Sequence, residues 1–339
     1  MIFCVQLNKN NHYHSITYHI NVNTLQKKLL VNAKFHGNFK DKQIMELPYK
    51  WANNNYWQQI NNIKILSPHK SFELDQTHSN QLTIYLIKPL KELEIAYEIH
   101  LPDDKQNFEE QSSIFDNDLL HVLGHNIFVL PGNILDSDRL KVKIKWNDLP
   151  NNWQIYSSFD DGNTQDFVVS EEQLLHSMYI VGKTRIYKKF IENKVVNFSI
   201  YGKFDFTDEI MIDNAVRIIA SQRNFFNDYD YKNYLVSIIE NPDKNQKQAS
   251  IFGSIFNNSL LLNFTKNISL TQLKLLIAHE HLHNWLGIKI RNSEEALNYW
   301  WSEGFTEYYT RVLLAKNNIL NINILINELN DFLKNYYTS

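Results

Sequence analysis

The sequence predicts two domains of different class, a β-rich domain over residues 1–170 and a domain with both strands and helices over residues 171–339. Three observations lead to this prediction. The chain has 339 residues, a length typical of two domains. The first half alternates apolar and polar residues over short runs separated by turn residues. The second half combines strand-like runs with longer helical patterns, as α+β and α/β folds do.

Short alternating segments mark the strands of the first domain. Alternation is clearest over residues 15–22, 82–87 and 140–146, and turn-forming clusters stand between such runs at 102–104, 131–133 and 160–163. Many short strands of this kind are typical of a sandwich or an open barrel. We therefore expect a β-sandwich-like N-terminal domain that ends near Ser170.

Strand and helix signals follow one another in the second half. Thr207 is a plausible N-cap, and Ser269 with Gln272 three residues later forms a capping-box pattern at the start of an apolar helix. Gly287 is a natural stop for that helix. Strands are expected at 195–202, 234–239 and within 250–264, and helices from Thr207 to about 226, from Ser269 to Gly287, at 303–316 and at 322–336.

Composition limits the classes of partner. Hydrophobic residues make up 43% and charged residues 21% of the chain, as in an ordinary globular protein, and the net charge of −3 offers no basic field to nucleic acid. The N-terminus lacks a signal-peptide pattern, and no apolar run reaches the roughly 18 residues of a membrane helix. The single Cys4 excludes an internal disulfide and a cysteine-based zinc site. We expect a cytoplasmic protein without nucleic-acid or membrane partners, and its oligomeric state is left open.

The segment His279–His283 reads HEHLH and matches the pattern H-E-x-x-H. On a helix, His279 and His283 are about 400° and about 6 Å apart, so both imidazoles lie on one face. They can bind one Zn²⁺ with a carboxylate as third ligand and an open position for water. Glu280 is then placed to take a proton from that water as general base. His281 points about 200° away, and we expect a surface or second-layer residue there.

A second segment, Trp301–Tyr309, supports this interpretation. The HExxH pattern alone is weak, because histidines one turn apart are usually packing or surface residues. Glu303 lies 20 positions after His283, among aromatic residues that we expect to bury its stem. Glu307, one turn later, shares its face and is expected to hydrogen-bond the outer nitrogen of a ligand histidine. The alternative for both glutamates is a solvated acidic helix face.

His-Glu-x-x-His followed by WSEGFTEYY resembles the gluzincin metallopeptidases, most closely the glycyl-aminopeptidase family. The similarity is strong over residues 279–312 and weak before them, and residues 47–65 distantly resemble that family's N-terminal β domain. The resemblance implies a thermolysin-like catalytic domain that binds one zinc ion per chain and hydrolyses peptide substrates. The ligands that it implies are His279, His283 and Glu303, with Glu280 as the base.

The sequence departs from the family in two places. The family's Gly-rich edge strand carries a glutamate for the substrate's free amine, and the matching stretch here is 252–259. Gly253, Ser254 and Phe256 are expected to border the substrate, but Phe256 stands where that carboxylate is expected. An aromatic ring pairs only weakly with an ammonium group, so the choice between exopeptidase and endopeptidase stays open.

The second departure concerns length. The family's chain continues into further helices that supply a transition-state tyrosine, so the catalytic domain is expected to be incomplete at residue 339, and Tyr308 and Tyr309 are weak substitutes.

Other functions remain compatible with the same residues. The chain can be a weak or inactive gluzincin-fold interaction module, a piece of a longer peptidase, or an ester or epoxide hydrolase on the same zinc platform. The intact Glu280 argues against the interaction module, since a scaffold has no physical need of a general base. Parallel assays on peptides, esters and epoxides separate the remaining possibilities.

Overall fold

The computed structural model describes residues 13–48, 50–51, 54–75, 80–102, 112–135, 138–241 and 249–338. Cys4 and the turn residues Asp103 and Asp104 lie outside these ranges. The described chain divides into two compact units, and the boundary between them along the sequence falls between Gly182 and Lys183. The sequence predicted a domain boundary near Ser170. The residues in between form α2 (Glu171–Leu175) and β16 (Met178–Gly182), and β16 hydrogen-bonds to two strands of the first unit.

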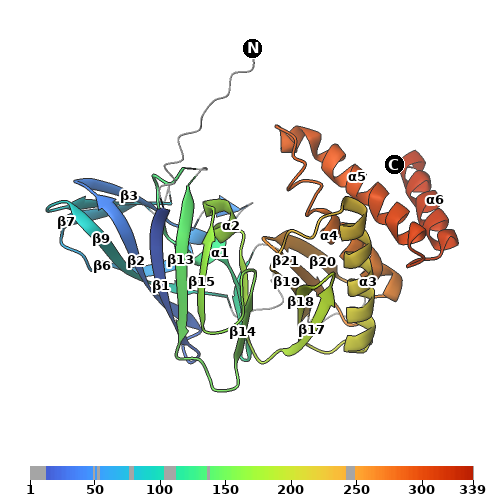
Figure 1. The fold of residues 1–339 in the computed structure, drawn as a ribbon, viewed down its shortest axis with the longest axis horizontal. Helices are drawn as coiled ribbons and strands as arrows, with labels where there is room; N and C mark the ends of the chain where they lie inside the picture. Colours follow the sequence, from blue (N-terminus) through green and yellow to red (C-terminus); the bar gives the residue numbers. More distant parts are fainter. Residues whose placement is uncertain are drawn as a thin grey trace, which may run out of the picture. The chain divides into compact units, whose positions relative to one another are not determined.

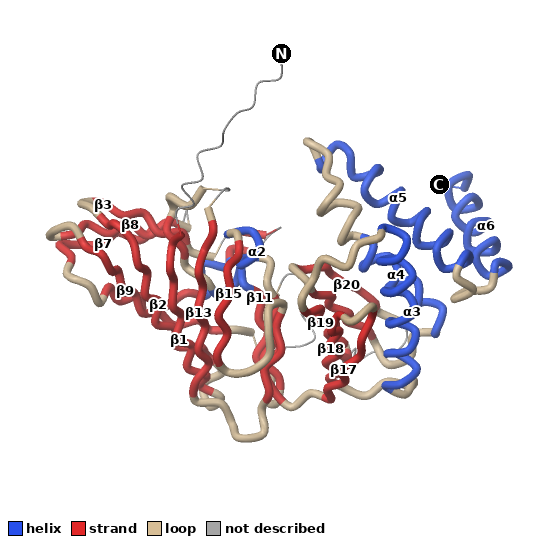
Figure 2. Tube along the Cα trace, in the orientation of Figure 1, coloured by secondary structure: helices blue, strands red, loops and turns tan. Residues whose placement is uncertain are grey.

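The first unit consists of β-sheets with two short helices, α2 and α1 (Gly124–Ile127) (Figure 2). Its largest sheet has six strands in the order β15 (Thr164–Val169), β13 (Arg139–Asn147), β1 (Tyr13–Asn23), β2 (Lys28–Phe39), β9 (Leu90–His100) and β6 (Ile60–Ile65). A four-stranded sheet follows the order β12 (Leu130–Pro131), β3 (Lys42–Glu46), β8 (Gln81–Leu86) and β7 (His69–Asp75). A second one follows β10 (Ile114–Phe115), β11 (Leu119–Leu123), β16 and β14 (Gln154–Ser157), and β4 (Lys50–Trp51) pairs with β5 (Asn54–Asn55) ahead of a 3₁₀ turn at Tyr56–Gln59.

Alternation along the strands builds the core of this unit. In β2, Leu29, Val31, Ala33 and Phe35 are buried while their neighbours are partly exposed, because successive side chains point to opposite faces of a strand. Buried residues from the three larger sheets form one hydrophobic core. The predicted β-sandwich-like class is confirmed, and the alternating runs at 15–22 and 140–146 fall in β1 and β13, while the run at 82–87 extends one residue past the end of β8.

The second unit contains a five-stranded mixed sheet (Figure 1). The strand order is β17 (Arg185–Ile191), β18 (Lys194–Tyr201), β19 (Asn233–Glu240), β21 (Ser259–Phe264) and β20 (Ile251–Phe256). β18, β19 and β21 run parallel, and β17 and β20 are antiparallel edge strands. Helices α3 (Asp208–Phe226) and α4 (Leu270–Leu282) share one hydrophobic core with one face of this sheet.

Two predicted helix starts are confirmed. The Thr207 side chain accepts a hydrogen bond from the Ile210 amide, and Ser269 and Gln272 form the reciprocal capping box. Helix α4 ends at Leu282, before the expected stop at Gly287, because the amides of the following residues bond carbonyls three positions back and tighten the chain into a turn. Gly287 has a φ of +101° in that turn.

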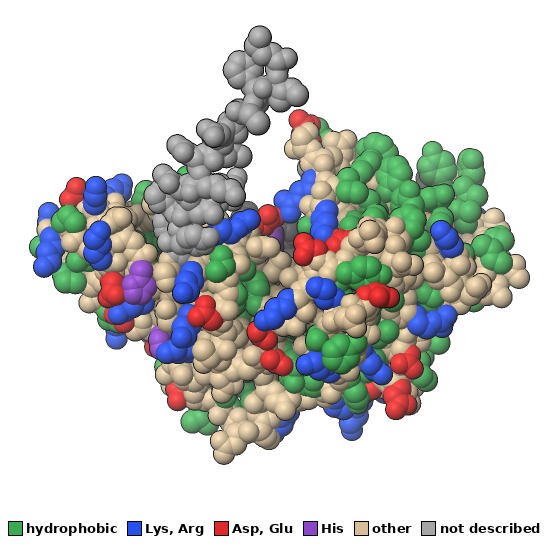
Figure 3. All heavy atoms as spheres, viewed as in Figure 1, with side chains coloured by type: hydrophobic (Ala, Val, Ile, Leu, Met, Phe, Trp, Pro, Cys, Tyr) green, Lys and Arg blue, Asp and Glu red, His purple; other side chains and the backbone are tan. Residues whose placement is uncertain are grey.

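Two more helices complete the unit, α5 (Glu295–Lys316) and α6 (Ile322–Thr338). Helix α5 begins earlier than predicted and is kinked at Asn298, where φ and ψ are non-helical. Hydrophobic side chains gather at the surface of α5 and α6 (Figure 3), including Trp300 at 68% and Leu329 at 53% exposure. None of the described helices contains an apolar stretch of the length that a membrane span requires.

Candidate metal centre

Helix α4 places two histidine side chains on one face. The opposite side of the helix is anchored in the core by Leu273 and Ile277, which are fully buried. His279 and His283 are therefore held on the outer side, with 18% and 16% of their side chains exposed. Their Nε2 atoms lie 3.2 Å apart, so the lone pairs of the two rings converge on one place, as the one-turn spacing predicted.

Glu303 reaches the same place from α5. One carboxylate oxygen lies 3.2 Å from Nε2 of His279, and the other lies 3.5 Å from Nε2 of His283. Within the part of the chain that the structure describes, these three residues form a group whose ligand atoms all lie within 4.8 Å of one another. Two imidazole nitrogens and one carboxylate are the donor set of a catalytic zinc site with an open position. The residues therefore fit a zinc ion.

The outer nitrogens of both rings face oxygen atoms. Nδ1 of His279 lies 3.0 Å from a carboxylate oxygen of Glu307, and Nδ1 of His283 lies 3.0 Å from the carbonyl oxygen of Leu286. A carbonyl oxygen only accepts hydrogen bonds, so the proton of His283 belongs on Nδ1 and its Nε2 is left for a metal. Glu307 thus lies at the outer nitrogen of His279, and its supporting role for that ligand stays a prediction, while the carbonyl of Leu286 was not foreseen.

Electrostatics in the metal-free protein couple these residues tightly. Burial lowers the pKa of His279, but the carboxylates of Glu303 and Glu307 outweigh it and raise that pKa to about 10. The close contact with His279 in turn lowers the pKa of Glu303, and a second contact with the same ring lowers the pKa of Glu307 to about 2 against the opposing effect of burial. A metal must displace the His279 proton, so metal affinity is expected to rise with pH.

Glu280 lies against the edge strand β20. A Cβ atom added to Gly253 would lie 2.4 Å from Cγ and 2.9 Å from Cδ of Glu280, closer than two carbon atoms can approach. The missing side chain of Gly253 is therefore what lets the Glu280 side chain lie along the strand backbone. Of the three residues predicted to border the substrate, Gly253 contacts the candidate base directly.

Ser254 and Phe256 are placed differently from that expectation. Strand alternation puts both on the face of β20 opposite to Gly253. Their exposed fractions are 7% and 2%, so neither offers a side-chain surface to solvent. The substrate-binding role of these two residues stays a prediction, and the Phe256 ring is buried.

The aromatic residues of α5 do not bury the acidic face as expected. Trp300 and Tyr308 are 68% and 60% exposed. Glu303 and Glu307 are instead held by their contacts with the histidines of α4. Tyr309 packs beside Phe225 of α3.

His281 occupies the far side of α4 and is fully buried. Its Nδ1 lies 2.7 Å from the side-chain oxygen of Gln222 on α3, and the Gln222 amide donates to the carbonyl of Ala278 at 2.8 Å. Its ring meets Tyr234 and Trp285 edge to face. His281 is thus excluded from the ligand group and is packed in the interior rather than at the surface. Gln222 was not foreseen, because nothing local in the sequence connects it with α4.

Known protein families and solved structures resemble parts of this chain. Residues 272–339 match the model of the M61 glycyl aminopeptidase family. The C-terminal region resembles the M61 glycyl aminopeptidases. This match confirms the resemblance that HEHLH and WSEGFTEYY predicted, and it covers the helices that carry both histidines and both glutamates. The comparison with curated proteins finds no match to the chain.

Solved structures resemble the whole described fold. An aminopeptidase N family protein from Idiomarina loihiensis superimposes with a TM-score of 0.73 at 14% identity, covering 91% of this chain and 56% of that one. An M1 zinc metallopeptidase from Deinococcus radiodurans gives a TM-score of 0.54 at 13% identity, covering 95% and 74%. A variant of the same enzyme bound to a Tyr-Ser-Ala substrate gives 0.55. The fold is therefore that of the M1 peptidases, and the chain spans about half the length of the Idiomarina protein.

Proposed function

We propose that this protein is a zinc-dependent peptidase in which His279, His283 and Glu303 hold the metal. The observation that carries the proposal is the convergence of the Nε2 atoms of His279 and His283 with the carboxylate of Glu303. Glu280 follows His279 directly on α4. The match of residues 272–339 to glycyl aminopeptidases supports the same conclusion. A bound zinc ion supplies Lewis acidity that polarises the scissile carbonyl.

The chain's own residues supply the proton transfers and the orientation. The Glu280 side chain lies along the backbone of β20, because Gly253 has no side chain to displace it. Glu280 accepts the proton of the attacking water and returns it to the leaving amine. Glu307 and the Leu286 carbonyl keep both histidines in the tautomer that leaves Nε2 for the metal. Among the described strands, β20 stands at the edge of the sheet, where an extended peptide can add as a further strand.

Substrate choice is proposed from what β20 offers. Residues Ile251–Phe256 contain no carboxylate, and Phe256 is buried. A free ammonium group brought to this strand loses hydration, and no side chain of the strand itself supplies a carboxylate to offset that loss. We therefore propose a peptidase with little preference for unblocked N-termini, and aminopeptidase activity is the alternative.

The test compares wild type with Glu280→Gln, using the exposed Glu209→Gln on α3 as a matched control. We expect about one zinc per chain in all three proteins by metal analysis. Glu280→Gln should lower kcat by at least about 10²-fold on a peptide library, since the amide cannot accept a proton. A fully active Glu280→Gln protein contradicts the assignment of the base.

The same library with free and acetylated N-termini tests substrate choice. Comparable rates on both are expected. Cleavage confined to free N-termini would show that another residue binds the amine.

A further inference from the structure

A chain of charged contacts leads away from the metal centre to the C-terminal helix. Glu307 contacts His279 with one carboxylate oxygen and the guanidinium of Arg311 with the other. Arg311 lies one turn after Glu307 on α5, and its Nη1 also donates to the backbone carbonyl of Glu307 at 3.0 Å. Its Nη2 lies 3.4 Å from a carboxylate oxygen of Glu328 on α6. Four side chains from three helices are thus connected in series.

The burial of Arg311 separates its contact with Glu307 from an ordinary surface ion pair. The side chain of Arg311 is 17% exposed, while that of Glu307 is 44% exposed. A carboxylate with that much solvent around it has other rotamers available, and an exposed pair one helical turn apart holds such a group only weakly. Nη1 of Arg311 donates to both the backbone carbonyl and the carboxylate of Glu307, while Nη2 faces Glu328, so the two sides of the guanidinium fork hold separate glutamates. These contacts restrict the Glu307 carboxylate to the rotamer that reaches His279.

Helix α6 is attached to the rest of the unit at few points. Among its side chains that the structure describes, Leu325 is buried and Glu328 is half-buried, and all the others are exposed. Leu325 belongs to the core shared by the sheet and α3. Glu328, the second attachment point, is the residue that contacts Arg311.

We propose that Arg311 is a positioning residue for the metal ligand His279. Because Arg311 also contacts Glu328 of α6, the packing of α6 then affects how His279 is oriented for a metal. Arg311 fixes the Glu307 carboxylate against His279, and Glu328 fixes the far side of the guanidinium. Loss of either contact lets Glu307 turn toward solvent and leaves the imidazole less well oriented for a metal. This inference rests on the proposed metal site.

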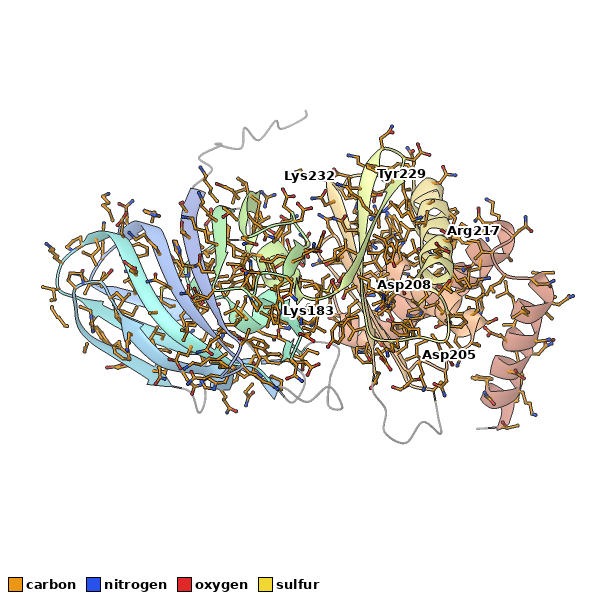
Figure 4. All side chains as sticks on the ribbon, turned by 90° about the horizontal axis from the view of Figure 1, so that it is seen from below. Lys183, Asp205, Asp208, Arg217, Tyr229 and Lys232 are labelled. Carbon is orange, nitrogen blue, oxygen red and sulfur yellow. The ribbon has the colours of Figure 1, made fainter. Side chains whose placement is uncertain are left out.

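Zinc affinity, measured by competition with a chromophoric chelator, tests the proposal. Glu307→Ala sets the scale, with an expected loss of about 10–100-fold. Arg311→Met should lose about 10-fold or more, and Arg311→Lys should recover part of this loss, since lysine keeps the charge but not the fork. Glu328→Gln should lose less than Arg311→Met. Arg217→Met on α3 (Figure 4) is the matched control, because Arg217 donates to the Asn318 carbonyl ahead of α6 without contacting Glu307.

Two further measurements separate positioning from a general effect on stability. The thermal midpoint of each metal-free variant reports stability alone, and the absorption spectrum of the Co²⁺-loaded protein reports ligand geometry. We expect a shifted Co²⁺ spectrum in Arg311→Met and Arg311→Lys, and an unshifted one in Arg217→Met. If Arg311→Met does not fold, Arg311→Lys and Glu328→Gln carry the test.

The outcomes distinguish this inference from the proposed function. Wild type that binds one zinc while the Arg311 and Glu328 variants keep its affinity and its Co²⁺ spectrum overturns the inference alone. Affinity lost to the same extent in Arg217→Met also overturns it. Wild type that binds no zinc overturns both proposals.

Discussion

The two sides of α4 carry the same side chain in opposite environments. On one side, His279 is partly exposed, and two carboxylates raise its pKa to about 10. On the other side, two residues along, His281 is fully buried, and burial together with the charge of Arg223 lowers its pKa well below the ordinary value. The His279 ring carries a proton that a metal would displace, whereas the His281 ring stays neutral inside the core.

The contrast shows that position on the helix, rather than residue type, decides what a histidine does here. The outer side faces Glu303 and Glu307 of α5, and the inner side faces Gln222 of α3. A helix that is packed on one side and open on the other can therefore use one residue type both as ligand and as packing element.

The largest expected effect comes from removing each histidine in turn. His279→Ala should reduce bound zinc from about one per chain to none, because the site loses one of three protein ligands. His281→Ala should retain stoichiometric zinc, since its ring faces away from the site. Metal analysis after dialysis checks both. Zinc retained in the first variant, or lost from a folded second variant, would remove the contrast between the two sides.

The outer side can be disturbed without touching a ligand. Gly253→Ala puts a methyl group where the Glu280 side chain lies, so the carboxylate must move. A displacement of about 1 Å at a catalytic group can cost about 10²-fold in kcat, and we expect a loss of that order with zinc content unchanged. Steady-state kinetics beside metal analysis give the answer. Wild-type turnover in this variant would mean that Gly253 does not set the position of Glu280.

The inner side should respond in stability rather than in chemistry. Gln222→Ala leaves Nδ1 of His281 buried without its acceptor, which we expect to cost about 1–3 kcal/mol of unfolding free energy. Ser221→Ala is the matched control, because the Ser221 hydroxyl donates within α3 to Ile218. Urea titration of the metal-free proteins measures both. Equal stabilities would show that the Gln222 contact contributes nothing to the packing of α4.

The contrast also predicts opposite pH dependences in the metal-free protein. The folded pKa of His281 lies below its unfolded value of 6.5, so the stability that its neutral form contributes is present above pH 6.5 and is lost as pH falls below it. His279 has a raised folded pKa of about 10, so its contribution is present below pH 6.5 and is lost as pH rises toward 10. His281→Ala should flatten the acid side of the stability profile, and His279→Ala the alkaline side.

Denaturant unfolding from pH 5 to 9 with a chelator present measures these slopes. His121 of the first unit, whose pKa burial lowers to about 3, adds an acid slope that both variants retain. Unchanged slopes in both variants would contradict the opposite environments of the two histidines.

The sequence by itself determined the class of both parts of the molecule and which residues form the candidate metal site. Period-two alternation identified strands such as β1 and β13, and the capping box at Ser269 located the start of α4. The four-residue spacing placed His279 and His283 on one face, and Glu303 and Glu307 on another. These inferences succeeded because neighbours within one helix or strand are fixed by its own repeat.

Only the tertiary structure decided the contacts between separate elements. Gly253 and Glu280, Gln222 and His281, and Arg311 and Glu328 each join segments whose distance in space is set by packing. The burial of the Phe256 ring was also decided by packing, since the sequence predicted only that Phe256 stands where an amine-binding carboxylate is expected. The repeat of one element encodes which face a side chain occupies, whereas what that face meets depends on how the elements pack.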